Sequence, residues 1–561
     1  MKYFVKIIKI LFKSFGYLIL AIIRLVLVMY LLLQNNTVQN YITDYFADIF
    51  SEKLKTEISI GSVDIEFFNK IVLEDFYIAD QNDDTLAYIN KFKIAIGNIQ
   101  FREKQLKINR IILDNSYINL SADSAGYFNY KFIIDYFSSD TVPDTSTVAW
   151  NISCTDFAIF NSRLQYKTKL NAVKKDPGIV DFKNLQLIDL NLNIHNSVFG
   201  TDSIIFEISN LDFIEHSGFQ VKKLFAKCLI DSQQIRLNNL LINTNNSEIK
   251  TPVFKLTFND LKTDFADFLN NVRLETTLDS STIYLSDLQY FSPVLKGLNR
   301  KVCLSGKFSG RIARIKGKEI ELFYGNDTKF FGGISMDGLP DFDNTFIHAD
   351  IDEFNTSIAD LESFPLPPFD ENKLLQLPYQ LDQLGKITYK GKLTGFFNDF
   401  VTYGNFQTAI GYLSTDLSLK QDTTKKLLVF SGDISTIDFY PGKLIGNSDL
   451  IGKLSFNAKI NGNTSTQTGR IEVLLDGKII QVDLLGYNYS DIIINGNLLN
   501  KKFDGQLIIN DPNIQMDFLG GIDFNEKIPV FDFTADVGNL NPYELKIDTL
   551  DSLLNAKFLV T

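Results

Sequence analysis

From residue 56 to the end of the chain, apolar and polar residues alternate, and few folds accommodate such a pattern. A period of two places successive side chains on opposite faces of a β-strand, so the pattern predicts strands with one apolar and one polar face. The alternation is clear at three sets of apolar positions: Phe254, Leu256 and Phe258; Leu454, Phe456, Ala458 and Ile460; and Phe531, Phe533, Ala535 and Val537. Between strands, Asn461-Gly462, Asn495-Gly496 and Asp504-Gly505 are typical of hairpin turns.

So many strands with few covering helices must bury their apolar faces somewhere. A sandwich pairs two sheets and a barrel closes one sheet on itself, whereas a long sheet can also curl into a trough. Sequence alone does not separate these folds, but the length of the array and its Phe content favour the trough. We therefore predict an all-β chain, apart from an N-terminal transmembrane helix and a short amphipathic helix, forming an elongated, curled β-sheet groove with an apolar lumen. The eleven apolar residues named above are the candidates to line it.

Composition argues against most catalytic and nucleic-acid-binding classes. The chain has 561 residues and a net charge of −12, without basic clusters, so no nucleic-acid partner is expected. Its three cysteines and three histidines lie far apart, and no metal-ligand spacing, nucleophile motif or phosphate-binding loop occurs. His348 is read as a surface residue. We expect no enzyme activity, no catalytic residue, no metal and no cofactor.

A run of apolar residues from 15 to 33 follows four lysines, Lys2, Lys6, Lys9 and Lys13. As a helix it would measure roughly 28 Å, close to the hydrocarbon thickness of a bilayer. Nothing resembling a signal-peptidase site ends the run. Because positive charge marks the cytoplasmic side, we predict a single-pass anchor with a basic cytoplasmic tail at 1–14 and the bulk of the chain on the far side of the membrane.

The next segment, 34–55, has apolar residues at three- and four-residue spacing and predicts an amphipathic helix, capped by Asn36 or Thr37. Its apolar stripe could lie on the outer leaflet of the membrane. Alternatively, it could cover the end of the β-structure, which the acidic opposite face slightly favours.

The remaining chain divides at two breaks. A first β segment is predicted over 56–136, an exposed loop over 137–148 and a middle β-groove over 149–363. A Pro-rich break with a short helix is predicted over 364–384, and a distal β-groove over 385–561, which we expect to continue in a longer protein.

Several short motifs, in order along the chain, resemble the N-terminal part of the TamB family, the inner-membrane subunit of the translocation and assembly module, in its Bacteroidetes-type form within the AsmA-like group. They are 58–63 (ISIGSV), 73–80 (LEDFYIAD), 287–293 (DLQYFSP), 304–310 (LSGKFSG), 338–341 (GLPD) with 345–347 (TFI), 503–506 (FDGQ) and 510–513 (NDPN). The signature domain found at the C-terminus of that family has no counterpart that we can assign.

The resemblance implies an inner-membrane anchor, a periplasmic β-groove and a role in outer-membrane biogenesis. It also implies phospholipid and the bilayer as partners, with an Omp85-type outer-membrane barrel protein as the partner known in proteobacteria. The expected function is conduction of phospholipid acyl chains between the inner and outer membranes. Two alternatives stay open at this point: a chaperone-like scaffold that captures outer-membrane protein strands by β-augmentation, and a structural tether.

Overall fold

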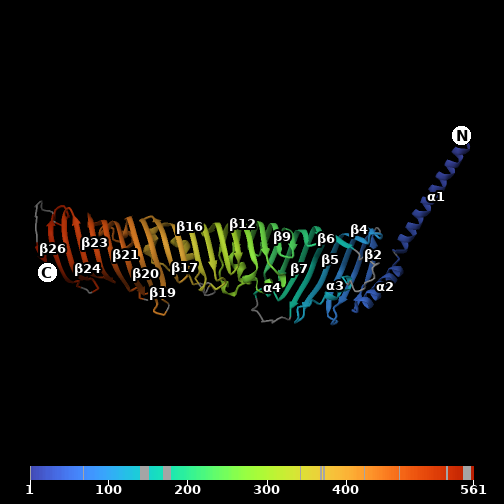
Figure 1. Cartoon of the computed structure of the whole chain (residues 1–561), viewed down its shortest axis with the longest axis horizontal. Helices are drawn as coiled ribbons and strands as arrows, with labels where there is room; N and C mark the ends of the chain where they lie inside the picture. Colours follow the sequence, from blue (N-terminus) through green and yellow to red (C-terminus); the bar gives the residue numbers. More distant parts are fainter. Residues whose placement is uncertain are drawn as a thin grey trace. The chain divides into compact units, whose positions relative to one another are not determined.

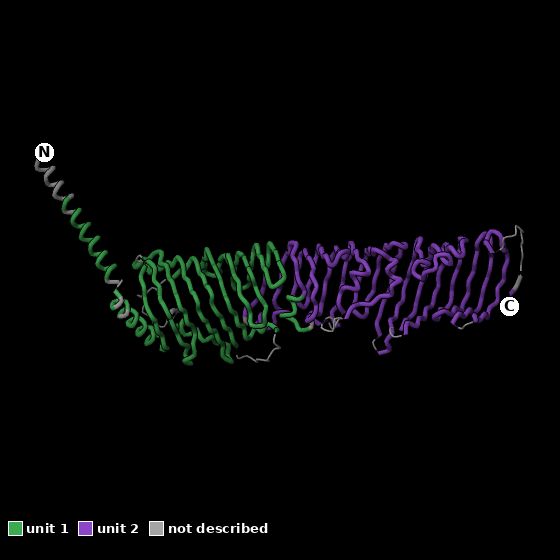
Figure 2. The backbone as a smooth tube through the Cα atoms, turned by 180° about the vertical axis from the view of Figure 1, so that it is seen from behind, with its two compact units in different colours: residues 1–255, 286–293 green, residues 256–285, 294–561 purple. Residues whose placement is uncertain are grey.

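The computed structural model describes residues 2–33, 35–66, 69–138, 151–168, 178–341, 343–366, 369, 373–422, 424–465, 468–525, 528–547 and 558–560. The chain forms two compact units, coloured separately in Figure 2. Unit 1 comprises residues 1–255 and 286–293, and unit 2 comprises residues 256–285 and 294–561. Both are built almost entirely of β-strands.

Unit 1 contains long strands that follow two N-terminal helices. The helices are α1 (Lys2–Leu33), α2 (Asn36–Leu54) and α3 (Lys131–Ser138), and the 3-10 helix η1 spans Leu285–Tyr290. The strands are β1 (Ile58–Ser59), β2 (Ser62–Glu66), β3 (Lys70–Ala79), β4 (Thr85–Gln100), β5 (Gln105–Ala122), β6 (Asn151–Thr168), β7 (Asn184–Phe199), β8 (Ser203–Glu215), β9 (Gln220–Asp231), β10 (Gln234–Thr244) and β11 (Glu248–Thr257).

Most neighbouring strands of unit 1 are antiparallel, with β1 and β2 both paired to β3. The exception is the pair β5–β6, which is parallel. A parallel pair requires the chain to return along the sheet between the two strands. The described part of the chain between the two strands includes α3, and hairpins alone do not account for the topology.

Unit 2 is a series of consecutive strands with a few short helices. The strands are β12 (Arg273–Tyr284), β13 (Lys301–Arg311), β14 (Arg314–Tyr324), β15 (Thr328–Asp337), β16 (Phe346–Ser357), β17 (Lys386–Phe396), β18 (Asp399–Thr408), β19 (Gly411–Asp422), β20 (Leu427–Phe439), β21 (Ile451–Ser465), β22 (Ile471–Leu484), β23 (Tyr487–Leu499), β24 (Lys502–Asp511), β25 (Ile514–Asp523), β26 (Val530–Leu540) and β27 (Phe558–Val560). The helices are α4 (Leu261–Ala266), α5 (Phe268–Asn271), α6 (Ile358–Ser363), α7 (Pro441–Leu444) and the 3-10 helix η4 (Tyr379–Leu384), while the 3-10 helix η2 (Pro293–Leu295) begins at the last residue of unit 1.

Each strand of unit 2 pairs in antiparallel fashion with the next strand along the chain, as the sequential colours of Figure 1 show. No pairing joins β12 to the last strands among the described residues, so the sheet of this unit is open. The mostly-β prediction is therefore confirmed, and the closed alternatives do not describe unit 2.

The N-terminal apolar run lies in α1, whose side chains from Phe15 to Leu31 are mostly exposed. Among the described residues, no helix is both long and apolar enough to cross a membrane. The predicted span, 15–33, includes Leu32 and Leu33, whose side chains lie outside the described part of the chain. The anchor remains a prediction.

The amphipathic helix is α2, and its N-cap is Asn35, whose side chain accepts a hydrogen bond from the backbone N–H of Thr37 at 2.9 Å. One side of α2, including Thr43, Ala47 and Leu54, is buried. Tyr41, Tyr45, Phe46 and Phe50 are instead exposed and form a line of ring contacts along the helix. The helix therefore covers the edge of the sheet, as one alternative predicted, but it also presents a second, aromatic surface.

The predicted hairpin turns at Asn461-Gly462, Asn495-Gly496 and Asp504-Gly505 are wrong. All three pairs lie inside strands, in β21, β23 and β24. The turn interpretation failed because glycine in a strand can instead mark a bend or a close approach of a neighbouring strand. Gly332-Gly333 also lies inside a strand, β15, and adjoins a shift of register between β15 and β16.

The predicted breaks differ in detail from the structure. The loop predicted over 137–148 begins within α3, and its remainder lies outside the described residues. In the region 364–384, an isolated bridge joins Pro365 to Leu374, and the only helix among its described residues long enough to name is η4.

Many long strands carry bulges near their middle. The non-glycine residues with positive φ inside strands are mostly Asn and Asp, such as Asn115 in β5, Asp189 in β7 and Asp491 in β23. These residue types tolerate the left-handed conformation, and each bulge bends its strand and increases its twist. Isolated Asn and Asp residues within strands therefore contribute to the curvature of the sheet.

Candidate functional site

Cross-strand register in unit 2 gathers alternate residues of successive strands onto one face. Partners in an antiparallel pair project to the same side of a sheet. We call this surface the apolar face of unit 2; in β21 to β26 it consists of Leu454, Phe456, Ala458, Ile460, Gly462, Val473, Leu475, Gly477, Ile479, Val482, Ile492, Ile494, Gly496, Leu498, Phe503, Gly505, Leu507, Ile509, Met516, Phe518, Gly520, Ile522, Phe531, Phe533, Ala535 and Val537. None of these residues is charged. The same register carries the face back to β12 through uncharged positions.

Several large side chains of the apolar face are only half-buried, whereas others, such as Ile492 and Phe518, are buried. Leu454, Phe456, Ile460, Phe503 and Phe533 all retain solvent-accessible surface. In a sandwich core, the second sheet would cover such residues completely. The two clusters of mutually packed, fully buried apolar residues found in the described structure both lie in unit 1, around Leu113 and Ala226.

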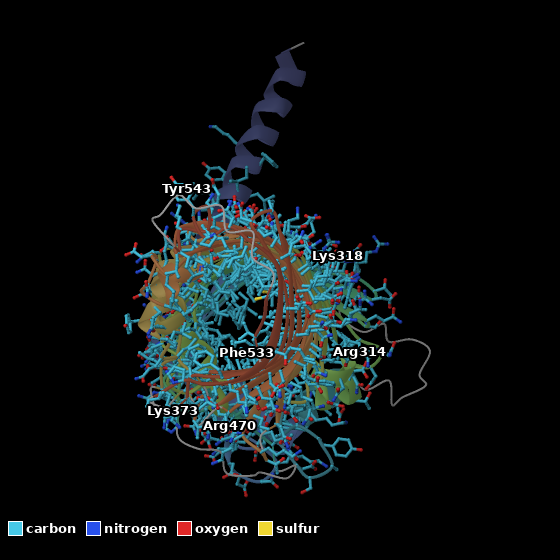
Figure 3. All side chains as sticks on the ribbon, turned by 90° about the vertical axis from the view of Figure 1, so that its left-hand side faces the viewer. Arg314, Lys318, Lys373, Arg470, Phe533 and Tyr543 are labelled. Atoms are coloured by element: carbon cyan, nitrogen blue, oxygen red, sulfur yellow. The ribbon has the colours of Figure 1, made fainter. Side chains whose placement is uncertain are left out.

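The sheet of unit 2 is curved, and its apolar face is on the concave side. Figure 3 shows the labelled Phe533 pointing into the space on this side, where the side chains are rich in carbon. The labelled Arg314, Lys318 and Arg470 project outward instead. The curvature therefore brings apolar side chains from successive strands toward a shared, uncovered space.

Glycines on the apolar face allow neighbouring strands to approach closely. Gly496 and Gly520 both lie directly opposite Gly505, from the strands on either side of it. A Cβ atom added at Gly496 would lie 2.7 Å from the Phe503 ring and 2.7 Å from the Asp504 carbonyl oxygen. Side chains crowd one another on the concave side of a bent sheet, so residues without a side chain relieve the crowding there. This row was missed in the sequence because its residues resembled hairpin turns.

The opposite face of unit 2 is polar, and ion pairs cross it from strand to strand. Lys420 Nζ lies 2.6 Å from Asp399 Oδ2, and the two residues are direct cross-strand partners. Lys392 Nζ and Asp350 Oδ1, also cross-strand partners, are 3.2 Å apart. His348 lies on this face as well, with Nδ1 2.8 Å from Thr394 Oγ1. Charge is thus segregated to the convex, solvated side.

The predicted positions in β21 and β26 lie on the apolar face, but not all of them are equivalent. Phe456 and Ile460 are half-buried, Ala458 is buried, and Phe531 is 57% exposed. Ser455 alternates with these apolar residues and is polar, yet it is buried, and its Oγ accepts a hydrogen bond from the Asp438 backbone N–H at 3.0 Å. The bulge between Thr436 and Phe439 creates this exception.

The predicted set Phe254, Leu256 and Phe258 is divided between the two units. Phe254 packs against the buried cluster of unit 1, whereas Leu256 and Phe258 belong to unit 2. Leu256 and Phe258 are both buried. The Phe258 ring meets the Phe265 ring of α4 edge to face, with centroids 5.4 Å apart. Leu256 and Phe258 therefore offer little surface to a ligand.

Two buried carboxylates, Asp511 at the end of β24 and Asp360 in α6, hold turns in place. Asp511 accepts hydrogen bonds from the Tyr487 hydroxyl at 2.6 Å and from the backbone N–H groups of Ser490 and Asn513, both at 2.9 Å. Asp360 accepts from the backbone N–H groups of residues 326–328. Burial raises the pKa of each carboxyl, but the hydrogen bonds outweigh it and hold the pKa below the ordinary value. These groups are structural, since every one is fully engaged by its turn.

No arrangement for catalysis or metal binding emerges from the described residues. They contain no cluster of His, Cys, Asp and Glu that could hold a metal ion. Cys228 is buried in unit 1, and burial raises the pKa of its thiol to about 11, which leaves it a poor nucleophile. The uncovered apolar face is the feature that remains to be explained.

Comparison with known proteins adds no relative, because no family model, curated protein or solved structure matches the chain.

Proposed function

We propose that this protein is a membrane-anchored β-groove protein of outer-membrane biogenesis that conducts phospholipid acyl chains between the inner and outer membranes. The observation that carries the proposal is the concave apolar face of unit 2, which is uncharged and on which many Phe, Leu and Ile side chains remain partly accessible. Exposed apolar surface of this extent usually marks a site for a ligand, membrane or partner.

An acyl chain fits this surface better than a peptide does. A peptide carries backbone N–H and C=O groups that must find hydrogen bonds, and the apolar face has few side chains able to provide them. An acyl chain needs none, and each buried CH₂ contributes about 0.8 kcal/mol. Because that contribution is similar at every position along a uniform apolar surface, the chain can slide without a large barrier.

The anchor in this proposal is α1, with the bulk of the protein in the periplasm and the N-terminus in the cytoplasm. Its side chains from Phe15 to Leu31 are exposed rather than packed against the sheet. The exposed Tyr41, Tyr45, Phe46 and Phe50 of α2 follow directly. Aromatic residues are enriched where a protein meets the membrane–water interface, so α2 suits a position at the outer leaflet.

The TamB-like motifs support the same role. They resemble motifs of a family that links the inner membrane to outer-membrane assembly, and we propose an Omp85-type barrel protein as the partner.

The test is a pair of substitutions on adjacent residues of β21. Phe456 projects from the apolar face, whereas Asn457 is exposed on the opposite face. In Phe456→Arg, the long side chain can keep its guanidinium group solvated on the open concave side, where it would obstruct acyl chains. We expect the full-length variant to remain folded but to copurify with less phospholipid by mass spectrometry, whereas Asn457→Arg should match the parent.

Two results would count against the conduit. If Phe456→Arg unfolds unit 2, the residue lies in a closed core and not beside an open groove. If the folded variant carries as much lipid as the parent, acyl chains do not pass this position.

One observation favours the alternative of a scaffold for β-augmentation. β27 covers β26 only from Ala535 to Val537, so residues 530–534 of β26 have no strand partner on that side among the described residues. An open edge of this kind can pair with an incoming strand. Cross-linking of an unfolded outer-membrane protein strand to this edge, with no lipid on the apolar face, would favour the scaffold.

A further inference from the structure

Three turns of unit 2 bring positive charge together at one edge of the sheet. The antiparallel register places the turns β19–β20, β21–β22 and β23–β24 beside one another at this edge. We call residues 422–427, 465–471 and 499–502 the basic edge. Its charged residues are one aspartate, Asp422, and five cations: Lys425, Lys426, Arg470, Lys501 and Lys502. In a chain with a net charge of −12, this is a local excess of positive charge.

The positive charge is confined to one section of one edge. Nearer to β15, the turns 337–346 and 396–399 form the same edge, and their charged residues are all acidic: Asp337, Asp341, Asp343 and Asp399. The opposite ends of β18 to β25 meet at the turns 408–411, 439–451, 484–487 and 511–514. The charged residues of those turns are Lys443, Asp449 and Asp511, so the opposite edge has no excess of cations.

Four cations of the basic edge lie in the turns themselves, and all four are exposed: Lys425, Lys426, Arg470 and Lys501. Lys425 Nζ lies 3.9 Å from Asp422 Oδ2. Lys502 is the cross-strand partner of Asp523, on the convex side. Because the cations outnumber these carboxylates, the basic edge keeps a positive potential.

Hydrogen bonds hold two of the turns against each other. The backbone N–H of Asn500 donates to the Ile471 carbonyl oxygen at 2.9 Å, and the Asn500 side-chain Oδ1 accepts from the Ile471 N–H at 3.0 Å. Arg470 and Lys501 are the chain neighbours of these two residues. The link therefore fixes the backbones that carry two cations, so that both side chains can reach one anion.

The basic edge directly adjoins the apolar face of unit 2. Leu498 and Phe503 are cross-strand partners on that face, on either side of the turn 499–502, and both are half-buried. Figure 3 shows Arg470 projecting away from the concave space, whereas Phe533 points into it. Cations thus border the groove without entering it.

We propose that the basic edge binds the phosphate of an anionic phospholipid whose acyl chains lie on the apolar face of unit 2. This inference rests on the proposed function and names a class of substrate for it. Lys and Arg donate charge-assisted hydrogen bonds to phosphate oxygens, and the apolar face accepts the chains. The acidic turns 337–346 and 396–399 disfavour the same headgroup, so it is retained beside β19 to β24.

Two probes with the same diazirine-labelled acyl chains test this inference on the full-length protein in an uncharged detergent. One is phosphatidylglycerol and the other is diacylglycerol, which has no phosphate. The double variant Arg470→Gln/Lys501→Gln should cross-link phosphatidylglycerol about fivefold less at low salt, because each exposed ion pair contributes a modest free energy. Diacylglycerol cross-linking should not change. In about 1 M salt the variant and the parent should become equal, because salt screens exposed charges.

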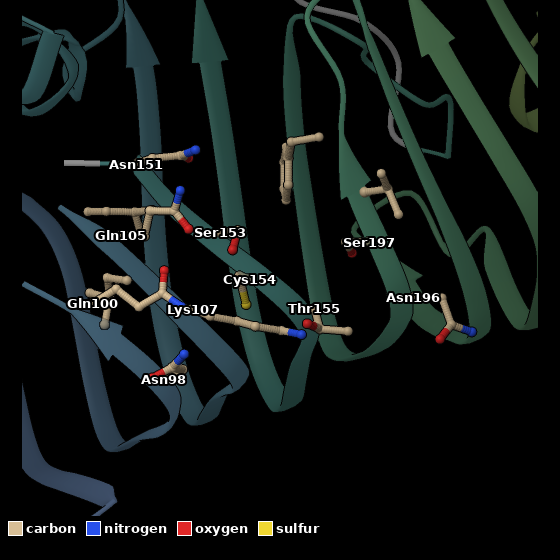
Figure 4. Close-up of a pocket in the computed structure, with 14 residues that line it drawn as sticks. Asn98, Gln100, Gln105, Lys107, Asn151, Ser153, Cys154, Thr155, Asn196 and Ser197 are labelled. Carbon is tan, nitrogen blue, oxygen red and sulfur yellow. The ribbon is translucent and has the colours of Figure 1, made fainter. Parts of the chain in front are cut away.

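Two controls remove positive charge elsewhere. Lys390→Gln/Lys459→Gln removes two exposed lysines from the convex face of unit 2. Lys107→Gln removes the one charged residue that lines a polar pocket of about 550 Å³ in unit 1, shown in Figure 4. A register shift between β4 and β5 places Lys107 on the face opposite the core residue Leu113. Both controls should cross-link each probe as the parent does, because neither position borders the apolar face.

Three results would overturn the headgroup site. The first is equal cross-linking of both probes in the parent. The second is a phosphatidylglycerol yield that is unchanged in Arg470→Gln/Lys501→Gln, or that falls equally in the controls. The third is complete protection by inorganic phosphate, which would assign the basic edge to a soluble phosphate compound. In each case, diacylglycerol cross-links on the apolar face would leave the proposed function standing, whereas the absence of cross-links there with either probe would count against that function itself.

Discussion

Two adjacent glycines of β25 offer a direct test of how the sheet of unit 2 is bent. Gly520 lies on the apolar face with φ +144°, and a Cβ atom added there would lie 2.7 Å from Phe533 Cβ and still closer to the β26 backbone. Gly521 lies on the opposite face, where an added Cβ would meet Asp504 Oδ2 at 3.5 Å and the Phe503 carbonyl oxygen at 3.6 Å. The first position has no room for a methyl group, whereas the second has ordinary contacts.

Gly520→Ala should therefore be destabilising. Overpacking against a backbone that cannot move freely costs about 1–3 kcal/mol, and a positive φ for alanine costs about 1 kcal/mol more. The sum, about 2–4 kcal/mol, would lower the Tm by roughly 3–6 °C in a unit of about 300 residues. Gly521→Ala should be neutral or slightly stabilising, because alanine restricts the unfolded chain.

Thermal unfolding of the full-length protein, followed by circular dichroism in detergent, measures both variants. The informative quantity is the difference between them, since the two sites share the same strand. If Gly520→Ala melts at the parental temperature, or if both variants lose the same stability, then the glycines are not what permits the close approach of β24, β25 and β26.

Three further predictions concern acid, the membrane and topology. The hydrogen bonds to Asp287, Asp360 and Asp511 lower the pKa of each carboxyl, and they outweigh the opposing effect of burial. The stabilisation from these carboxylates is therefore complete above the ordinary pKa of 3.8 and is lost as the pH falls through the lower folded-state values. The urea midpoint should be constant from neutrality to about pH 5 and should drop below about pH 4. Replacing Tyr45 and Phe46 of α2 with glutamate should weaken insertion of the α2 surface into anionic vesicles, measured by quenching with brominated lipid, and unchanged quenching would place the helix away from the bilayer. Reporter fusions after the first β segment should be active only in the periplasm, and activity confined to the cytoplasm would refute the proposed orientation.

Local sequence was sufficient for much of the secondary structure. Alternation places Leu454, Phe456, Ala458 and Ile460 on one face of a single strand, because the side-chain period of a strand is fixed by backbone geometry. The apolar spacing of α2 predicts its helix in the same way. Such patterns depend only on residues that are neighbours in the chain.

The same local patterns were misleading where a distant strand decides what a residue does. Asp504-Gly505 has the sequence of a turn, yet Gly505 lies inside β24. There it is paired with Gly496 and Gly520 of the two flanking strands. Ser455 is polar within an alternating pattern, yet a bulge in β20 buries it. Neither partner is visible from the local sequence.

The candidate sites show this division most clearly. Sequence indicated that the apolar positions would share a face, but the openness of that face depends on whether a second sheet covers it, and that is a property of the whole unit. The pairing of β5 with β6 is parallel, which no local pattern predicts, because each residue of β5 meets one far along the chain, as Lys107 meets Ser153. Periodicity thus determined which side chains share a face of an individual strand. Register and curvature decided which of those faces meet and which remain exposed, because both arise from contacts between residues far apart in the chain.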